Sequence, residues 1–287
     1  MRVLILGNDT PLGQALVKRL VALARHEPVT LSRSACRWKS ERHAKKTVRR
    51  ADSDIVVDIR IDAAADGSEQ IHDLDLKRCR WVAKACHRNK LPYLYLSSSR
   101  VFSGELGRPY TEQDEPDNRE TLGRLLAAGE EAVRESCEHH FILRLGPIFS
   151  KEAPNLITQM LGEMMEGGSL VLDNNLRGCP VAAGDGARVI SAVLDQLSTG
   201  VEAWGTYHYC SSDTATYYEF AEALLAAASQ FSEFSSSAVQ LEQDKEGSRP
   251  LNRALDCHKI LNTFAIKQVP WRSSVADIVK QYYADQT

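Results

Sequence analysis

The sequence predicts an α/β fold with a Rossmann-like, doubly wound parallel sheet and a smaller, interwoven C-terminal lobe. Short apolar runs alternate with segments of helical periodicity, which is typical of a parallel sheet covered by helices on both faces. A turn with two glycines follows the first apolar run at residues 7–13. The chain has 287 residues, of which 43% are hydrophobic, enough for one large core with a lobe attached to it.

The first half of the chain alternates strands with helices. The apolar run 2–6 predicts a buried strand, and the leucines of 11–24 recur at helical spacing. Thr10 suits the cap of this helix and Pro11 its first position. Further strands are expected at 29–31, 54–57, 93–96 and 141–145, and further helices at 41–50, 74–89 and 122–136.

After about residue 150 the pattern changes. Helices are expected at 155–167, 185–197, 217–228 and 275–283, strands at 169–172 and 205–209, and a polar connection at 232–237. The chain shows no repeat and no long linker. We therefore expect residues 1–150 to form a dinucleotide-binding domain, and 151–287 to form a substrate-binding lobe woven into it.

Composition and charge exclude several classes of protein. The formal net charge is −3 and both signs are mixed along the chain, with a local basic excess only at 33–50, so we expect no nucleic-acid partner. No run approaches the ~18 apolar residues of a membrane helix, and 1–7 is too short for a secretory signal, which predicts a cytoplasmic protein without membrane contact. The seven cysteines are scattered and predict neither a metal site nor structural disulfides.

The glycine turn fits the pattern of a dinucleotide site in part. Gly7 and Gly13 occupy the first and last places of a G-x-x-G-x-x-G pattern, while Thr10 stands at the middle place, where the chain approaches the phosphates. Pro11 removes one N–H donor from the helix start, and Asp9 adds a negative charge. The residues predicted to contact a cofactor here are Gly7, Asn8, Thr10, Pro11, Leu12 and Gly13.

The residues at the end of the second strand indicate whether NAD or NADP would bind. An acidic residue at this place holds the ribose of NAD, whereas an arginine accommodates the extra phosphate of NADP. The strand runs into Ser32, Arg33 and Ser34, so NADP is favoured over NAD if a cofactor binds. The alternative is that Arg33, Arg37 and Lys39 form a solvated basic loop.

Further motifs follow the glycine turn along nearly the whole chain. They are 97–104 (similar to S-T-D-Y-V-F-x-G), Ala128-Gly129-Glu130, 173–180 (similar to D-Q-x-G-x-P), Gly205-Thr206-Tyr207-His208, and 249–256, which begins with Arg-Pro. These motifs follow one another in the order found in the dTDP-4-dehydrorhamnose reductase family (RmlD-like, sugar-nucleotide-binding) of the extended short-chain dehydrogenase/reductase superfamily. The chain resembles this family. The resemblance implies a Rossmann fold, NADP and a nucleotide-linked sugar.

The resemblance also implies that two catalytic groups are missing. In that family a Ser or Thr, a Tyr and a Lys act together. The Tyr hydroxyl protonates the substrate carbonyl, and the Lys lowers the pKa of the Tyr and holds the cofactor ribose. Ser98 matches the first of these, but the family's register places Leu122 at the tyrosine and Leu126 at the lysine. Losing a positioned acid costs ~10²- to 10⁴-fold in rate, so the resemblance predicts a pseudoenzyme.

Other positions depart from the family as well. Asp58 and Arg60 stand where the family has N-A-A, and Ser99 and Arg100 replace the Asp-Tyr of S-T-D-Y. Either Asp58 and Arg60 pair with each other or with solvent, or Arg60 and Arg100 fill the cleft or bind a new anion. A relocated Tyr110 is an alternative proton donor.

Arginines mark the segments that the family uses for the nucleotide-sugar. Arg177, Arg249 and Arg253 lie in or near these segments, where guanidinium groups suit a diphosphate, although each could instead form a structural ion pair. The predicted substrate-binding residues are Arg100, Arg177 and Arg249.

The motifs and the departures from the family leave three possible functions. The first is a catalytically impaired relative with a binding role or a regulatory role on a protein partner. The regulatory β subunit of methionine adenosyltransferase, which resembles the same family, is a precedent. The second is an NADP-dependent reductase or epimerase with a relocated proton donor. The third is a scaffold without a cofactor. The sequence leaves the ligand, the protein partner and the oligomeric state open.

Overall fold

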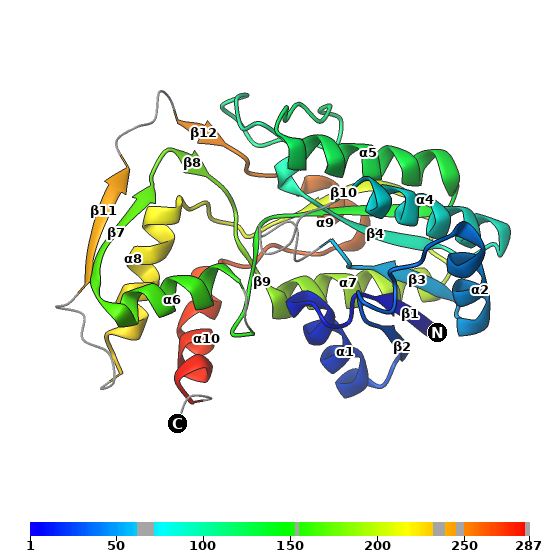
Figure 1. Cartoon of the computed structure of the whole chain (residues 1–287), viewed down its shortest axis with the longest axis horizontal. Helices are drawn as coiled ribbons and strands as arrows, with labels where there is room; N and C mark the ends of the chain where they lie inside the picture. The colour runs from blue at the N-terminus through cyan, green and yellow to red at the C-terminus, as the bar shows by residue number, and fades with distance from the viewer. Residues whose placement is uncertain (62–71, 153–154, 232–238, 245–249, 285–287) are drawn as a thin grey trace.

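A six-stranded parallel sheet forms the centre of the larger part of the molecule (Figure 1). The computed structural model describes residues 1–61, 72–152, 155–231, 239–244 and 250–284. The strands lie in the order β10-β5-β4-β3-β1-β2. Their bounds are β1 (Arg2–Leu6), β2 (Glu27–Leu31), β3 (Ile55–Asp58), β4 (Tyr93–Ser98), β5 (His140–Leu145) and β10 (Gly205–Tyr209).

Helices cover both faces of the sheet. On one face α1 (Pro11–Leu23) packs against α7 (Ala183–Ser198), with α9 (His258–Phe264) beside α7 and β10. On the other face lie α2 (Glu41–Ala51), α4 (Asp73–Arg88) and α5 (Thr121–Ser136) (Figure 1). The predicted Rossmann-like architecture is thereby confirmed.

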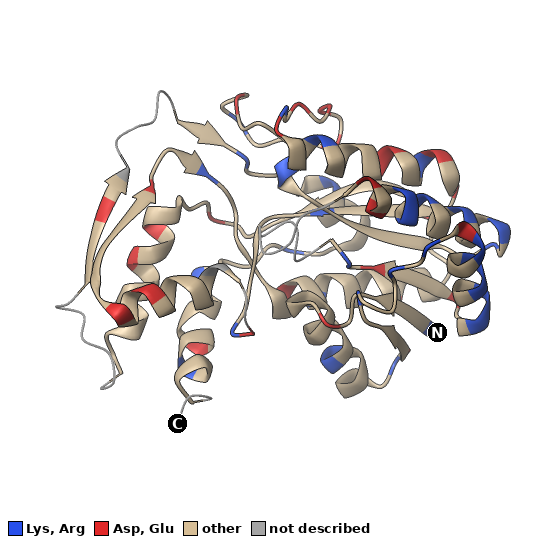
Figure 2. Ribbon diagram, in the orientation of Figure 1, with Lys and Arg blue, Asp and Glu red and all other residues tan. Residues whose placement is uncertain are grey.

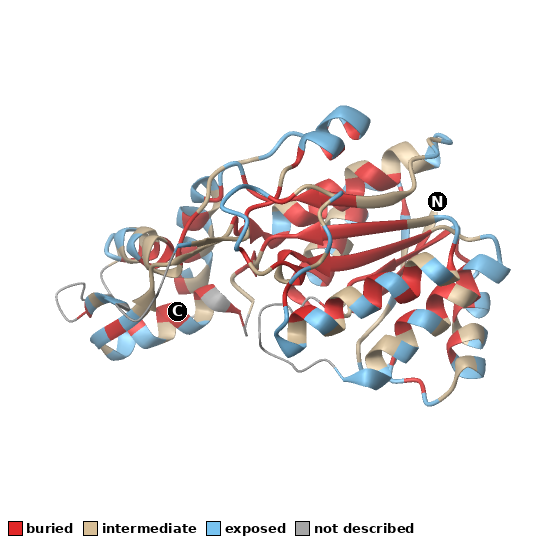
Figure 3. Ribbon diagram, turned by 90° about the horizontal axis from the view of Figure 1, so that it is seen from above, coloured by how far each residue is buried: buried red, intermediate tan, exposed pale blue. Residues whose placement is uncertain are grey.

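The central strands are buried on both sides, as their continuous apolar sequences predict (Figure 3). In β1, Val3 to Leu6 have no exposed surface, and every residue of β3 and β4 is buried. β2 forms the edge of the sheet and is only partly buried. It begins two residues earlier than expected, because edge residues such as Glu27 lack the apolar signal.

A second hydrophobic cluster forms a smaller lobe beside the sheet (Figure 1). Phe149, Phe220 and Trp271 lie at its centre. Its elements are α6 (Leu156–Glu166), α8 (Tyr217–Ala228), α10 (Arg272–Ala284), and the parallel pair β7 (Gly168–Asp173) and β11 (Val239–Asp244). Between α6 and α8 the chain returns to the sheet to form α7 and β10, so the two parts are interwoven.

Short elements connect the two parts, and the sequence did not reveal them. They are the parallel pairs β6 (Ile148–Phe149) with β9 (Val181–Ala182) and β8 (Leu176–Arg177) with β12 (Leu251–Asn252), and the 3₁₀ helix η1 (Ser99–Val101). Two-residue strands have no periodicity to detect. The helix α9 was missed for a similar reason: it has seven residues and buries only Ile260 and Phe264. The expected connection 232–237 lies outside the described residues.

Basic side chains gather on α2 and around it (Figure 2). Ala44 and Val48 face the core, while Arg42, Lys46 and Arg49 are exposed. The thiols of all seven cysteines are free and buried. Among the described helices, none has the length and apolar character needed to cross a membrane.

Candidate functional site

The carboxyl ends of β1 and β3 lie side by side where the order of the sheet reverses. β2 lies on one side of β1 and β3 on the other. Ligands of open α/β sheets bind in the crevice at such a point. The turn between β1 and α1 therefore borders this crevice, as do the segments that follow β3 and β4.

The turn after β1 has the backbone shape that its glycines predict. Gly7 has a φ of +93°, which side chains rarely tolerate, and a Cβ there would lie 3.0 Å from the backbone of Arg60. A Cβ on Gly13 would lie 2.2 Å from the Gly7 carbonyl oxygen. Thr10 is fully buried; its hydroxyl donates to the Gly7 carbonyl at 2.9 Å and accepts from the Gly13 N–H at 3.0 Å. The turn therefore closes on itself through Thr10.

Several groups that would bind a phosphate at the start of α1 are absent or already bonded. Pro11 has no N–H, and the N–H of Gly13 is bonded to Thr10. The carboxylate of Asp9 accepts from the backbone N–H of Arg33 at 2.8 Å and from its Nε at 3.3 Å. The turn fits a dinucleotide in its backbone shape, but the polar groups predicted to hold the phosphates are partly engaged within the protein.

The basic loop after β2 divides into two kinds of residue. Arg33 is bound to Asp9 of the turn, whereas Arg37 and Lys39 are exposed and form no ion pair with a residue in the described ranges. The solvated-loop alternative thus fits Arg37 and Lys39 and not Arg33. The other residues predicted to contact a cofactor lie in the same turn and loop: Asn8, Leu12, Ser32 and Ser34.

Asp58, the last residue of β3, forms a buried ion pair with Arg60. Arg60 Nε lies 2.8 Å from Asp58 Oδ1, and Nη2 lies 2.6 Å from Oδ2. The Tyr93 hydroxyl also donates to Oδ2, at 2.6 Å, and the guanidinium lies over the ring of Trp38 at 5.3 Å. Although burial opposes the charged form, Asp58 holds the pKa of Arg60 above its usual value. Mutual pairing, the first of the two alternatives, is confirmed.

The resemblance assigns positions 98, 122 and 126 to catalysis, and of the three side chains only that of Ser98 has a hydroxyl group. Ser98 ends β4, and its buried Oγ accepts from the backbone N–H of Arg100 at 3.2 Å. Leu122, in the first turn of α5, is half-buried, and Leu126, one turn later, is 1% exposed. Their spacing places both leucines on one face of α5, which packs against η1. Neither leucine can donate a proton or hold a ribose hydroxyl.

A buried network of charged residues holds α5 against the sheet. Glu130 of α5 accepts from the Ser97 hydroxyl at 2.6 Å and from Arg134 Nη2 at 2.7 Å. It also accepts from Nε and Nη2 of Arg144, at 2.8 and 2.6 Å. Arg144 Nη1 lies 3.2 Å from Nε2 of His208. The network fixes the helix that carries both leucines relative to β4, β5 and β10.

His208 should make the stability of the protein depend on pH. Burial, and then Arg144, lower its pKa from the usual 6.5 to about 3. The unfolded chain therefore takes up a proton near pH 6.5 and the folded chain only near pH 3, so the free energy of unfolding falls as the pH falls through this window. The contribution of this group is about 1.4 kcal/mol per pH unit.

We expect the His208→Gln variant to lose this contribution between about pH 6 and pH 4.5. Urea unfolding of both proteins across that range measures the two slopes. Other titrating groups contribute to both proteins alike, so the difference between the slopes reports His208. Equal slopes would mean that His208 titrates normally in the folded protein and would contradict the prediction.

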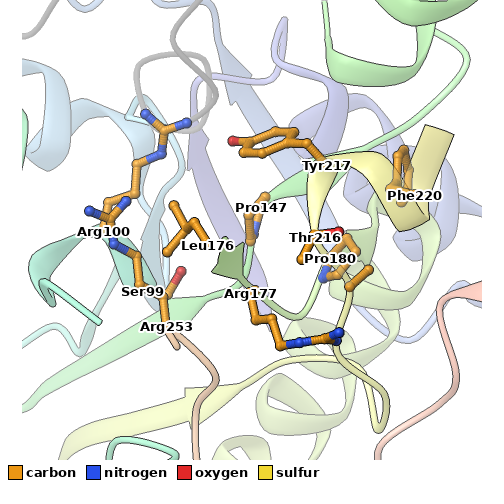
Figure 4. A pocket seen from close by; sticks show the side chains of 12 residues that line it. Ser99, Arg100, Pro147, Leu176, Arg177, Pro180, Thr216, Tyr217, Phe220 and Arg253 are labelled. Carbon is orange, nitrogen blue, oxygen red and sulfur yellow. The ribbon is translucent and has the colours of Figure 1, made fainter. Parts of the chain in front are cut away.

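A pocket opens between the end of β4 and the small lobe (Figure 4). Arg100 and Arg253 lie together on one side of it, and Tyr217 and Phe220 of α8 lie across from them. The pocket therefore has a cationic side and an aromatic side. Its lining residues are Ser99, Arg100, Pro147, Leu176, Arg177, Gly178, Pro180, Ala215, Thr216, Tyr217, Phe220 and Arg253.

Arg177 lines the pocket, but its guanidinium is bound elsewhere. Nη1 donates to Glu219 at 2.9 Å and to the Thr214 hydroxyl at 3.3 Å, and Nη2 bonds to the second oxygen of Glu219. The side chain extends away from the cationic side of the pocket (Figure 4). Arg177 therefore follows the ion-pair alternative, while Arg249 lies outside the described residues.

The two arginines on the cationic side are less well neutralised. The guanidinium of Arg100 forms no hydrogen bond or ion pair with any part of the chain that the structure describes. Arg253 Nε donates to the carbonyl of Ser103 at 3.3 Å, and Nη2 lies 3.8 Å from the exposed carboxylate of Glu120. Burial lowers the pKa of Arg253; Glu120 opposes this effect and Arg100 adds to it. The pocket thus carries an excess of positive charge.

The alternative of a relocated Tyr110 is wrong. Tyr110 is fully buried and stacks on Phe102 at 4.0 Å, and its hydroxyl is bonded to the N–H of Gly104 at 3.0 Å and to Asp117 at 3.3 Å. A tyrosine that does line the pocket is Tyr217, which sequence reasoning missed. Tyr217 lies in the first turn of α8, and nothing in the sequence around it, apart from the helix cap at Thr216, indicates that it lines a pocket. No three His, Cys, Asp or Glu side chains in the described ranges are placed to hold a metal ion.

The chain is similar to known proteins over nearly its whole length. The family described as RmlD substrate binding domain matches residues 1–284. A dTDP-4-dehydrorhamnose reductase from Sinorhizobium fredii is 25% identical, with 97% of each chain covered. Methionine adenosyltransferase 2 subunit beta from Danio rerio is 23% identical, with 99% of this chain and 92% of that protein covered.

A solved structure shares the fold. The crystal structure of dTDP-4-dehydrorhamnose reductase from Bacillus anthracis in complex with NADP has a TM-score of 0.79 and 20% sequence identity, with 98% of each chain covered. This chain and that enzyme thus share the same fold, with a Rossmann-like sheet and a small lobe. The match of the family along residues 1–284 shows that this chain belongs to the RmlD substrate-binding-domain family.

Proposed function

We propose that this protein binds a nucleotide-linked sugar in the pocket between the sheet and the small lobe, and that it does not reduce this sugar as a reductase of its family would. The observation that carries the proposal is the pair Leu122 and Leu126, which share one face of α5, a helix that contacts η1. Catalysis by this family's chemistry needs a proton donor there, whereas binding in the pocket does not.

The lining of the pocket supports a nucleotide-linked sugar as the ligand. Guanidinium groups bind phosphates and carboxylates with paired hydrogen bonds, and Arg100 and Arg253 supply two of them. Tyr217 and Phe220 offer flat apolar surfaces on the opposite side, which suit a base or the face of a sugar ring. A ligand with an anionic part and a flat part matches both sides.

NADP binding is proposed to be weaker than in an active reductase. Residues 7–13 and Arg33 would hold the cofactor, and the bound cofactor would supply a hydride. Pro11 and Thr10 reduce the number of free N–H groups at the helix start, and Arg33 must leave Asp9 to reach a phosphate. These contacts support weak binding rather than none.

A binding or regulatory role is the biological consequence we propose. The Danio rerio relative is named as a subunit of an enzyme, which supports such a role for a member of this family. The division at about residue 150, with a dinucleotide-binding part before it and a substrate-binding part after it, is part of the same proposal.

A second candidate is an NADP-dependent reductase or epimerase with a relocated proton donor. Tyr217 favours it, because this phenol lines the pocket and is the kind of group that the chemistry requires. The relatives named as reductases also favour it. It differs from the first proposal in one measurable property, which is turnover.

Calorimetric titration with dTDP-glucose and NADPH, and a turnover assay with dTDP-4-dehydrorhamnose and NADPH, test the proposal. We expect saturable binding of dTDP-glucose and NADPH oxidation at least ~100-fold slower than that of an RmlD reductase assayed alongside. Turnover at the rate of the reductase would overturn the proposal in favour of the second candidate. Absence of any binding of dTDP and of its sugar conjugates would overturn both.

A further inference from the structure

Arg100 places a positive charge close to where the chemistry of a reductase would occur. It belongs to η1, which directly follows β4, and its backbone N–H is bonded to the hydroxyl of Ser98. Ser98 is the catalytic position that this chain retains. The sugar end of a bound nucleotide-sugar, rather than its nucleotide end, should therefore lie nearest to Arg100.

The charge of Arg100 is not balanced by any side chain that the structure describes. No described side chain accepts from its guanidinium, and the neighbouring Arg253 is a second cation. The carboxylate nearest to Arg253, that of Glu120, is 3.8 Å away and 71% exposed. A half-buried guanidinium without a partner is unfavourable, and a ligand carboxylate with two oxygens would satisfy it.

The other arginine of the pocket shows what a balanced site looks like. Arg177 pairs through both terminal nitrogens with Glu219, so its charge is matched without a ligand. Among the described lining residues, the excess of positive charge therefore lies on the Arg100 side of the pocket. If the diphosphate lies toward Arg253 and the sugar toward Arg100, a neutral sugar leaves the charge of Arg100 unmatched, whereas an acidic sugar matches it.

We infer that the pocket takes a nucleotide-linked sugar with a carboxylate on the sugar ring, held by Arg100 with Arg253 beside it. This inference rests on the proposed function, because it assumes a nucleotide-linked sugar in this pocket. It adds the chemical class of the sugar: a uronate rather than a neutral hexose.

Titration with dTDP-glucuronate, dTDP-glucose and dTDP tests the inference. The two sugars differ only in a carboxylate against a hydroxymethyl group, so their ratio of affinities isolates the carboxylate. We expect dTDP-glucuronate to bind at least ~10-fold more tightly than dTDP-glucose, as a charge-assisted bond to a guanidinium would provide. Equal affinities for the two sugars would overturn the inference and leave the proposed function standing. If none of the three ligands binds, the proposed function fails as well.

The Arg100→Gln variant assigns the effect to one residue. It should lose the ~10-fold preference for dTDP-glucuronate over dTDP-glucose, and a preference that survives in the variant would overturn the inference. An equal loss of affinity for dTDP, dTDP-glucose and dTDP-glucuronate would show that Arg100 holds only the diphosphate, and would overturn the inference. Arg124→Gln is the matched control, because Arg124 is an exposed arginine of α5 outside the pocket lining, and it should keep the preference. Urea unfolding of Arg100→Gln and Arg124→Gln reports whether both variants are folded.

Discussion

Replacing Glu130 by glutamine should lower the free energy of unfolding by about 3 to 5 kcal/mol. The substitution keeps the shape of the side chain, so the effect is one of charge and not of a cavity. It leaves Arg144, which is 1% exposed, facing a neutral amide on one side and a neutral imidazole on the other. A buried guanidinium without a countercharge is among the costliest defects that one substitution can create.

Urea unfolding of the wild type and the variant measures this loss, and Glu131→Gln serves as the matched control. Glu131 is the next residue along α5 and also pairs with Arg134, at 3.1 Å, but its side chain is 61% exposed. An exposed pair of this kind contributes about 1 kcal/mol or less. Similar small losses in both variants would mean that the network carries no net charge interaction of consequence.

A second substitution separates charge from packing in the same network. Adding Arg144→Met to Glu130→Gln removes the unpaired cation and keeps most of the side-chain volume. The double variant should therefore recover part of the stability that Glu130→Gln loses. Further loss on adding Arg144→Met would assign the effect to the packing of Arg144 against Phe102 instead.

The sequence was sufficient for the sheet because its strands are buried on both faces. A strand such as Val3 to Leu6 must be continuously apolar, and this property is visible without any partner. The close approach of Gly13 to the Gly7 carbonyl likewise depends only on neighbours in the chain. Local signals of this kind predicted the architecture and the turn correctly.

The chemistry of the crevice depends on contacts between distant segments, which the sequence does not display. The bond from Arg33 to Asp9 joins residues 24 apart, and it changes a predicted phosphate-binding arginine into part of an ion pair. The exclusion of Tyr110 as a proton donor depends on its hydrogen bonds to residues after β4. The side on which Tyr217 would reach the pocket depends on how the small lobe packs against the sheet.

Restoring a tyrosine at 122 and a lysine at 126 together should raise the reductase rate by about 10²- to 10⁴-fold over a matched variant that lacks only the hydroxyl. The two variants are Leu122→Tyr/Leu126→Lys and Leu122→Phe/Leu126→Lys. Both carry the same ring and the same lysine, so the ratio of their rates isolates the proton donor. NADPH oxidation in the presence of the dTDP-linked ketosugar used above measures it, at cofactor concentrations high enough to offset weak binding.

The lysine makes the matched design necessary. Leu126 is 1% exposed, so an ammonium group there must reach the crevice along its own aliphatic stem or be buried at a cost in stability. That cost is common to both variants and cancels in the ratio of rates. It does not cancel against the wild type, so urea unfolding of both variants is measured as well. If the tyrosine and phenylalanine variants are folded, bind NADPH and turn over equally slowly, the leucines are not what separates this protein from a reductase, and the polar groups engaged by Thr10 and Asp9 become the cause to test.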